Sequence, residues 1–280
     1  MRASHFTDPA CPFAFSAEPQ RQQLRWHYGD QLEIVDYMVV LSEQTDEMRA
    51  KGFDTAKLAK GFQSLQGKYG MPINISERKR LAISVDACRA FVAARLNAPE
   101  RAEALLRALR VRTMGGVDGG LLDDPALIAG AARDAGIDPN ELAEWTAAAA
   151  TEDALRADMA AARDPHPAAR VLDHKLGDWS GGRRYTCPSY VFEHGGNSVA
   201  LPGFQPWESY DAAIANLHPE ITRRPAPEGV SEILAWADEP LATAEIAALL
   251  GTSTSKAREQ LEAADARFDG IGEDGYWTAE

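Results

Sequence analysis

The chain has 280 residues, of which 45% are hydrophobic, and its formal net charge at pH 7 is −13. This length permits a sizeable core in one to three domains, whereas the acidic balance argues against a general nucleic-acid binder, which needs a basic face. The sequence contains no apolar run of about 18 residues, so we expect no membrane-spanning helix.

The N-terminal part shows a strand–helix–strand pattern. Residues 3–7 are predicted to form a short strand, and a helical pattern follows in which Pro12 suits the first helical position and Gly29 a stop. Pro19 lies inside this pattern and predicts a kink. Residues 32–40 are β-rich and are predicted to form a largely buried strand. This order predicts a parallel βαβ unit.

The composition then becomes Ala-rich and helical over residues 54–163, where we expect four to six helices in an inserted lobe. The β pattern returns in residues 185–193 and 198–201, which are predicted to form two strands joined by a tight turn. A helix is predicted from Trp207 to Leu217. The proline-rich segment after it reads as a linker.

The C-terminal segment, residues 230–280, is predicted to contain three helices and a short hairpin, the outline of a winged helix. Residues 228–280 carry 12 acidic and 3 basic residues. Because phosphate contacts require cations, a structural or protein-contacting role is favoured over binding to nucleic acid.

Three cysteines are too few, and odd in number, for a disulfide framework, and no apolar secretory segment precedes the first of them. A cytoplasmic location is therefore predicted. Cys88 lies on the apolar face of a predicted helix and is expected to pack in the core. No set of His, Cys and Asp residues has the spacing of a metal site, and no glycine-rich phosphate loop is present, so no metal site is predicted.

Cys11 follows a predicted strand and directly precedes a predicted helix. The unpaired N–H groups and the dipole at a helix N-terminus favour a thiolate, which suits covalent sulfur chemistry. The alternative, a small apolar residue at a strand–helix junction, is equally compatible with the position. Pro188 falls within a strand pattern. A proline in such a pattern usually lies on an edge strand, which is the favoured interpretation. The alternative is a cis peptide bond between Cys187 and Pro188.

The order of these features over residues 3–217, with the motif TDPACPFA, the strand YGDQLEIVDYMVV and the later segment CPSYVF, resembles the DsbA-like branch of the thioredoxin superfamily. The resemblance implies an α/β thioredoxin-like fold with an inserted helical domain. The predicted boundaries are 1–53 and 164–218 for the thioredoxin-like domain, 54–163 for the insertion, 219–229 for the linker and 230–280 for the winged-helix-like unit.

The resemblance also implies the residues of the site. Cys11 would be the nucleophile, Pro188 a cis-proline that faces it, and Cys187 its neighbour in space. The implied substrate-binding residues are Pro12, Phe13, Ala14 and Thr186.

Ala14 occupies the position at which two-cysteine members of the family carry the second, resolving thiol. Our leading hypothesis is a thiol–disulfide oxidoreductase or thiol transferase of the monothiol type. Its co-substrate would be a low-molecular-weight thiol such as glutathione or mycothiol, and its substrate a thiol or disulfide in a small molecule or a protein. Alternatively, Cys187 resolves the mixed disulfide.

Two further classes remain open. One is an enzyme similar to kappa-class glutathione transferases and hydroxychromene-carboxylate isomerases, which also lack the cysteine pair. The other is a non-catalytic adaptor or regulatory binding protein. The sequence leaves a homodimer open and does not identify the substrate.

Overall fold

The protein is described by a computed structural model that covers residues 1–279. Its chain begins with strand β1, Arg2–Thr7, and after a helical segment forms strand β2, Glu33–Met38. The two strands pair in parallel, which confirms the predicted βαβ unit.

The helical segment between these strands is divided in two. Helix α1 spans Pro12–Ser16 and helix α2 spans Glu18–Tyr28, with Ala17 between them. Pro19 is the second residue of α2 and has no N–H to continue the hydrogen bonding of α1, so the predicted kink is a complete break. Gly29 ends α2 with a φ of +48°, and the short 3₁₀ turn η1, Gly29–Gln31, leads into β2.

The main sheet has the strand order β2–β1–β5–β6, in which β5, Ser189–His194, is antiparallel to both of its neighbours. Strand β6 spans Asn197–Leu201. The predicted strand at 185 begins only at Ser189. Tyr185 donates its N–H to the carbonyl of Ala162 at 2.9 Å, and Pro188 has no N–H to give to a neighbouring strand, so this segment is a loop.

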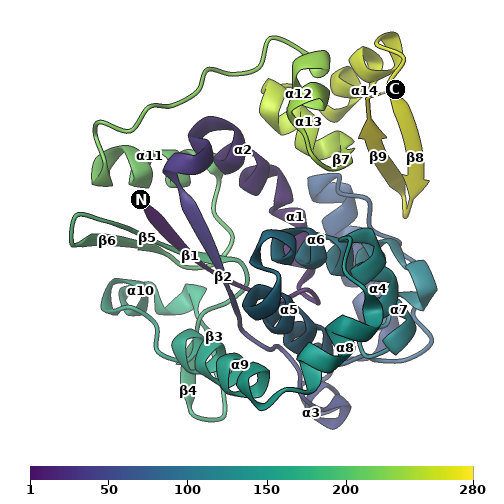
Figure 1. Cartoon of the computed structure of the whole chain (residues 1–280), viewed down its shortest axis with the longest axis vertical. Helices are drawn as coiled ribbons and strands as arrows, with labels where there is room; N and C mark the ends of the chain where they lie inside the picture. The colour runs from purple at the N-terminus through teal and green to yellow at the C-terminus, as the bar shows by residue number, and fades with distance from the viewer. Residues whose placement is uncertain (280) are drawn as a thin grey trace.

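Helices cover both faces of this sheet (Figure 1). On one face, α2 and α11, Trp207–Leu217, pack against aromatic residues of β5 such as Phe192. On the other face, the end of α9, Ala149–Ala162, and helix α10, Pro167–Val171, pack around Phe6 and Val191. Cys11 belongs to this second cluster, so the thiol lies at the edge of a packed layer.

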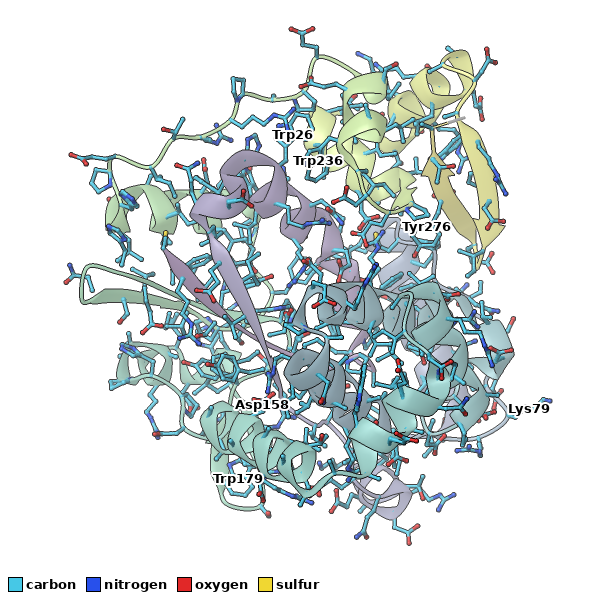
Figure 2. The ribbon with its side chains drawn as sticks, in the orientation of Figure 1. Trp26, Lys79, Asp158, Trp179, Trp236 and Tyr276 are labelled. Carbon is cyan, nitrogen blue, oxygen red and sulfur yellow. The ribbon has the colours of Figure 1, made fainter. Side chains whose placement is uncertain are left out.

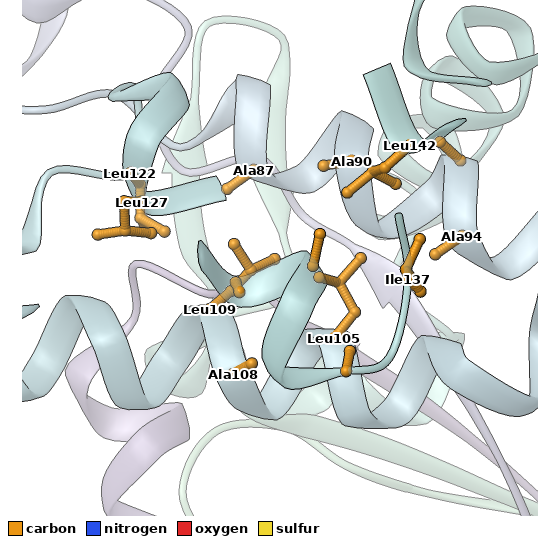
Figure 3. Close-up of a cluster of buried hydrophobic side chains, with 14 residues drawn as sticks. Ala87, Ala90, Ala94, Leu105, Ala108, Leu109, Leu122, Leu127, Ile137 and Leu142 are labelled. Atoms are coloured by element: carbon orange, nitrogen blue, oxygen red, sulfur yellow. The ribbon is translucent and has the colours of Figure 1, made fainter. Parts of the chain in front are cut away.

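The helical lobe follows β2 and is built around small and branched side chains (Figure 3). Ala87, Ala90 and Ala94 on one helix face Leu105 and Leu109 on the next, so the helices approach closely. The elements are α3 Thr45–Ala50, α4 Thr55–Tyr69, α5 Val85–Asn97, α6 Pro99–Gly115, η2 Val117–Gly120, α7 Pro125–Asp134, α8 Pro139–Ala147 and α9 Ala149–Ala162.

Sequence patterns did not indicate the hairpin between the lobe and β5. It consists of β3, Gly177–Trp179, and β4, Gly182–Arg184, and follows the turn η3, Asp173–Lys175. Arg183 ties it to the preceding turn, because its Nε lies 2.8 Å from a carboxylate oxygen of Asp173. These strands are short and depend on that tertiary contact, which explains why local propensity missed them.

The C-terminal segment contains the three predicted helices and the predicted hairpin, together with one short strand that was not predicted. Its sheet has the order β7–β9–β8. The elements are α12 Val230–Trp236, β7 Leu241–Ala242, α13 Thr243–Leu250, α14 Thr254–Ala263, β8 Arg267–Ile271 and β9 Asp274–Thr278.

A buried ion pair joins this C-terminal unit to the lobe. Arg107 of α6 places its two terminal nitrogens 2.5 and 2.7 Å from the two carboxylate oxygens of Glu245, which is fully buried on α13. Arg107 also donates to the carbonyl of Pro240 at 2.9 Å. Glu18 of α2 lies 3.4 Å from the same guanidinium, so three parts of the fold meet here.

The segment between α11 and α12 runs along α2 and is fastened to it. The indole N–H of Trp26 donates to the carbonyl of Pro225 at 2.7 Å, and the guanidinium of Arg224 lies 3.5 Å from the centre of the Trp26 ring system. Gln31 adds a pair of hydrogen bonds to the backbone of Thr222. Among the helices of residues 1–279, none combines the length and the apolar character needed to cross a bilayer.

Candidate functional site

Cys11 occupies the N-cap position of α1, where Pro12 is the first helical residue. Its backbone is extended, with φ −80° and ψ 111°, and its N–H donates to the carbonyl of Asp8 at 3.1 Å. The turn that begins at Asp8 therefore places the sulfur of Cys11 beside the free N–H groups of the helix. This is the position that the sequence predicted for it.

The sulfur of Cys11 also meets the loop that precedes β5. The Cys11 thiol lies 3.3 Å from the carbonyl oxygen of Cys187, and the peptide bond between Cys187 and Pro188 is cis. Only 6% of Cys11 and 7% of Cys187 is exposed. The fold thus brings the three residues predicted as catalytic together.

The two thiols have opposite acidities. A hydrogen bond from the Cys187 side chain lowers the pKa of Cys11, and backbone N–H groups of Ala14 and Phe13 add to this effect against the opposing effect of burial. Burial raises the pKa of Cys187 well above that of an ordinary thiol, and the hydrogen bond and charge of Cys11 raise it further. Cys11 is therefore the more acidic of the two thiols, and Cys187 holds its proton more tightly.

The residues predicted to bind substrate lie around this pair in different settings. Phe13 is 47% exposed beside Cys11, so its ring is available to a substrate. Ala14 is buried in the same cluster as Cys11. The Thr186 hydroxyl donates to the carbonyl of Lys175 at 2.7 Å, which engages it in the loop itself.

Asp8 is a buried carboxylate near Cys11 that the sequence analysis overlooked. It accepts hydrogen bonds from the N–H groups of Ala10 and Leu41, both at 2.7 Å, and from the Ser84 hydroxyl at 2.8 Å. The Cys88 thiol, buried in the core as predicted, donates to it at 3.5 Å. Burial raises the pKa of Asp8. The Asp-Pro step just before the cysteine was the available signal, because aspartate there favours a local turn.

A second buried polar group lies behind the sheet. His5 of β1 contacts the carboxylate of Asp36 at 2.6 Å, and Arg21 of α2 binds both oxygens of that carboxylate at 3.0 Å. The His5 ring stacks on Tyr190 with 4.2 Å between ring centres. Burial lowers the pKa of His5 to about 4, so the imidazole is neutral at pH 7. This group fixes α2 to the two parallel strands.

A cysteine at the N-terminus of a helix that follows a β-strand, opposite a cis-proline loop that leads into the neighbouring strand, defines the thioredoxin-like class of α/β proteins. Within that class the assignment is narrower. The family model described as a DSBA-like thioredoxin domain matches residues 4–166, and the chain belongs to this family. No curated protein sequence matches the chain.

Several solved structures share the fold. A candidate protein disulfide isomerase from Nitrosomonas europaea matches with a TM-score of 0.56 and 18% identity, covering 77% of this chain and 96% of that one. A candidate DsbA oxidoreductase from Streptomyces coelicolor matches with a TM-score of 0.54 and 19% identity, covering 82% and 94%. The cytosolic disulfide reductase DsbM from Pseudomonas aeruginosa matches with a TM-score of 0.53 and 18% identity, covering 78% and 100%. At these identities the likeness establishes the fold.

Proposed function

We propose that the protein catalyses thiol–disulfide exchange with Cys11 as the nucleophile. The observation that carries this proposal is the position of the Cys11 sulfur, at a helix N-terminus and in contact with the Cys187 loop. In the first step, the Cys11 thiolate attacks one sulfur of a substrate disulfide. A mixed disulfide forms on Cys11, and the other half of the substrate leaves as a thiolate.

We further propose that Cys187 releases the mixed disulfide in place of the second cysteine of a Cys-x-x-Cys pair. Burial raises the pKa of Cys187, and the hydrogen bond and charge of a Cys11 thiolate raise it further. Once Cys11 is joined to the substrate, that charge is gone and the Cys187 thiol loses one of the causes that raise its pKa. Cys187 then gives up its proton and attacks the Cys11 sulfur, which forms a Cys11–Cys187 disulfide and frees the substrate as a thiol.

Two molecules of a low-molecular-weight thiol, such as glutathione or mycothiol, return the protein to its starting state. They reduce the Cys11–Cys187 disulfide to two thiols and are themselves oxidised to one disulfide, so the electrons balance. A structure of DsbM from Pseudomonas aeruginosa was determined with GSH, which supports a small thiol as co-substrate in this fold. The exposed Phe13 ring beside the thiolate offers apolar contact to the substrate.

Treatment with oxidised glutathione, followed by mass spectrometry of the intact chain without reductant, tests both steps. We expect the native chain to form the Cys11–Cys187 disulfide and Cys187→Ser to accumulate a glutathione adduct on Cys11. Cys88→Ser is the matched control, because Cys88 is buried in another cluster, and it should behave as the native chain.

The other outcomes separate the proposals. If Cys187→Ser reduces cystine at the expense of glutathione as fast as the native chain, the small thiol itself releases the adduct and the protein is of the monothiol type. If the native chain acquires neither an adduct nor a disulfide, both steps are wrong and a binding protein is the better assignment.

A further inference from the structure

A cavity of about 830 Å³ lies between the helical lobe and the C-terminal unit. Helix α6 and the end of α7 form one wall, and strands β8 and β9 form the other. Figure 2 shows Tyr276 of β9 at this junction. The lining includes neither Cys11 nor Cys187, so the cavity is separate from the thiol pair.

The size and lining of this cavity suit a small organic molecule. Its volume falls in the range of about 300–1,000 Å³ that is usual for such sites. Ala104 and Val111 of α6 and Ile271 of β8 supply apolar surface. An apolar or planar body can therefore pack between the two walls.

The charged part of the lining contains five arginines and four carboxylates, and only some of the arginines are paired. Arg112 binds Asp134 at 2.6 Å, and Arg107 binds Glu245 as described above. Among the residues that the structure describes, 1–279, no carboxylate lies within ion-pair distance of three other lining arginines, which are Arg101, Arg133 and Arg267.

The carboxylates of the lining are largely neutralised. Asp134 is held by Arg112, while Asp238 and Glu239 both pair with Arg25, at 4.0 and 2.8 Å. Within residues 1–279, Asp269 is the one lining carboxylate without such a partner. The lining thus holds five arginines against four carboxylates, in a chain whose net charge is −13.

Tyr276 of β9 belongs to the wall that the C-terminal unit contributes. Its side chain lines the cavity and is only 6% exposed, and its hydroxyl has no hydrogen-bond partner among residues 1–279. A buried hydroxyl without a partner costs free energy, which a phenylalanine would avoid. The hydroxyl is itself closed to water-sized atoms, so an anion in the cavity reaches it only if the Tyr276 side chain moves.

We propose that this cavity binds a small organic polyanion that carries phosphate or carboxylate groups on an apolar body. Arg101 and Arg133 hold the anionic groups, because guanidinium forks match the geometry of phosphate and carboxylate oxygens. The C-terminal unit contributes Arg267 and Ile271, so the site is complete only when this unit is docked on the lobe. This binding does not depend on the thiol chemistry of Cys11.

Calorimetric titration of the full chain with pyrophosphate and with citrate tests the site. We expect saturable binding of at least one probe that weakens as salt is added. Arg101→Gln and Arg133→Gln should each lower the affinity at least tenfold. Arg49→Gln is the matched control, because Arg49 is exposed on α3 and already pairs with Asp46, and it should bind as the native chain.

Binding of pyrophosphate alone assigns phosphate groups, and binding of citrate alone assigns carboxylates. The proposal is overturned if neither probe gives saturable binding, or if Arg49→Gln loses as much affinity as Arg133→Gln.

Discussion

The Cys11 sulfur lies 3.3 Å from the carbonyl oxygen of Cys187, although 176 positions separate the two residues in sequence. In a Cys-x-x-Cys motif the second thiol comes from the same helical turn as the first. Here the second thiol comes from the opposite side of the site, on the loop that leads into β5. With Ala14 at this position, Cys11 has no second thiol close to it in sequence. Cys187 nevertheless lies close to it in the fold.

The contact between the two thiols predicts a change in acidity. Cys187→Val should raise the pKa of Cys11, because it removes the hydrogen bond that contributes most to lowering it. The backbone N–H groups of α1 stay in place, so the pKa of Cys11 should remain partly lowered. The pH dependence of alkylation by iodoacetamide measures this, with Cys88→Ser, which keeps a donor to Asp8, as the control. An unchanged pKa in Cys187→Val would show that the helix N-terminus alone activates Cys11.

Removal of Arg107 should loosen the C-terminal unit. Arg107→Met leaves the fully buried carboxylate of Glu245 without its partner, which typically costs about 3–5 kcal/mol. Urea unfolding of the full chain measures the loss. Arg156→Met, which breaks a half-exposed pair with Glu152, should cost less than about 1 kcal/mol. Equal losses in the two variants would contradict a structural role for the buried pair.

The turn between β8 and β9 should tolerate no side chain at Gly272. A Cβ there would lie 2.7 Å from the carbonyl oxygen of Pro72, and the φ of +60° is itself unfavourable for alanine. Gly196→Ala isolates the backbone cost, because its φ is +81° and nothing lies within 4 Å of the added carbon. Gly272→Ala should lower the free energy of unfolding by at least about 1 kcal/mol more than Gly196→Ala. Thermal unfolding of both variants decides this.

Stability should fall between pH 6.5 and pH 4 because of His5. Burial lowers the pKa of His5 from 6.5 to about 4, so the unfolded chain takes up a proton in this range that the folded chain refuses. The cost grows as the pH falls and reaches about 3 kcal/mol near pH 4. Urea unfolding at several pH values should show a weaker pH dependence for His5→Gln than for the native chain. If the free energy of unfolding depends on pH in the same way for both proteins, His5 does not contribute to that pH dependence.

Local signals in the sequence were enough to predict much of the fold. Helix α11 begins at Trp207 and ends at Leu217, as the pattern of apolar residues predicted. Gly29 ends α2 because glycine adopts the positive φ required there. Cys11 was placed correctly because the strand before it and the proline after it both act over a few residues.

Local signals could not predict contacts between residues that are far apart in the sequence. Glu18 and Arg107 read as ordinary charges on helix surfaces, yet both are buried, because each finds its partners on another part of the fold. The same holds for the cavity beside Tyr276, since its two walls come from segments that are far apart in sequence. The proximity of Cys187 to Cys11 was implied only by family resemblance, because no spacing rule links residues so far apart.

The segment between α11 and α12 has one further consequence. A free tether of this length would let the C-terminal unit sample many orientations, and binding that needs both walls of the cavity would first have to overcome that entropy. Trp26, Arg224 and Gln31 hold the tether along α2. The tether therefore loses its conformational freedom when the protein folds, before any ligand binds. The two walls therefore behave as one preorganised receptor, and a single backbone cut in the tether should leave both pieces associated.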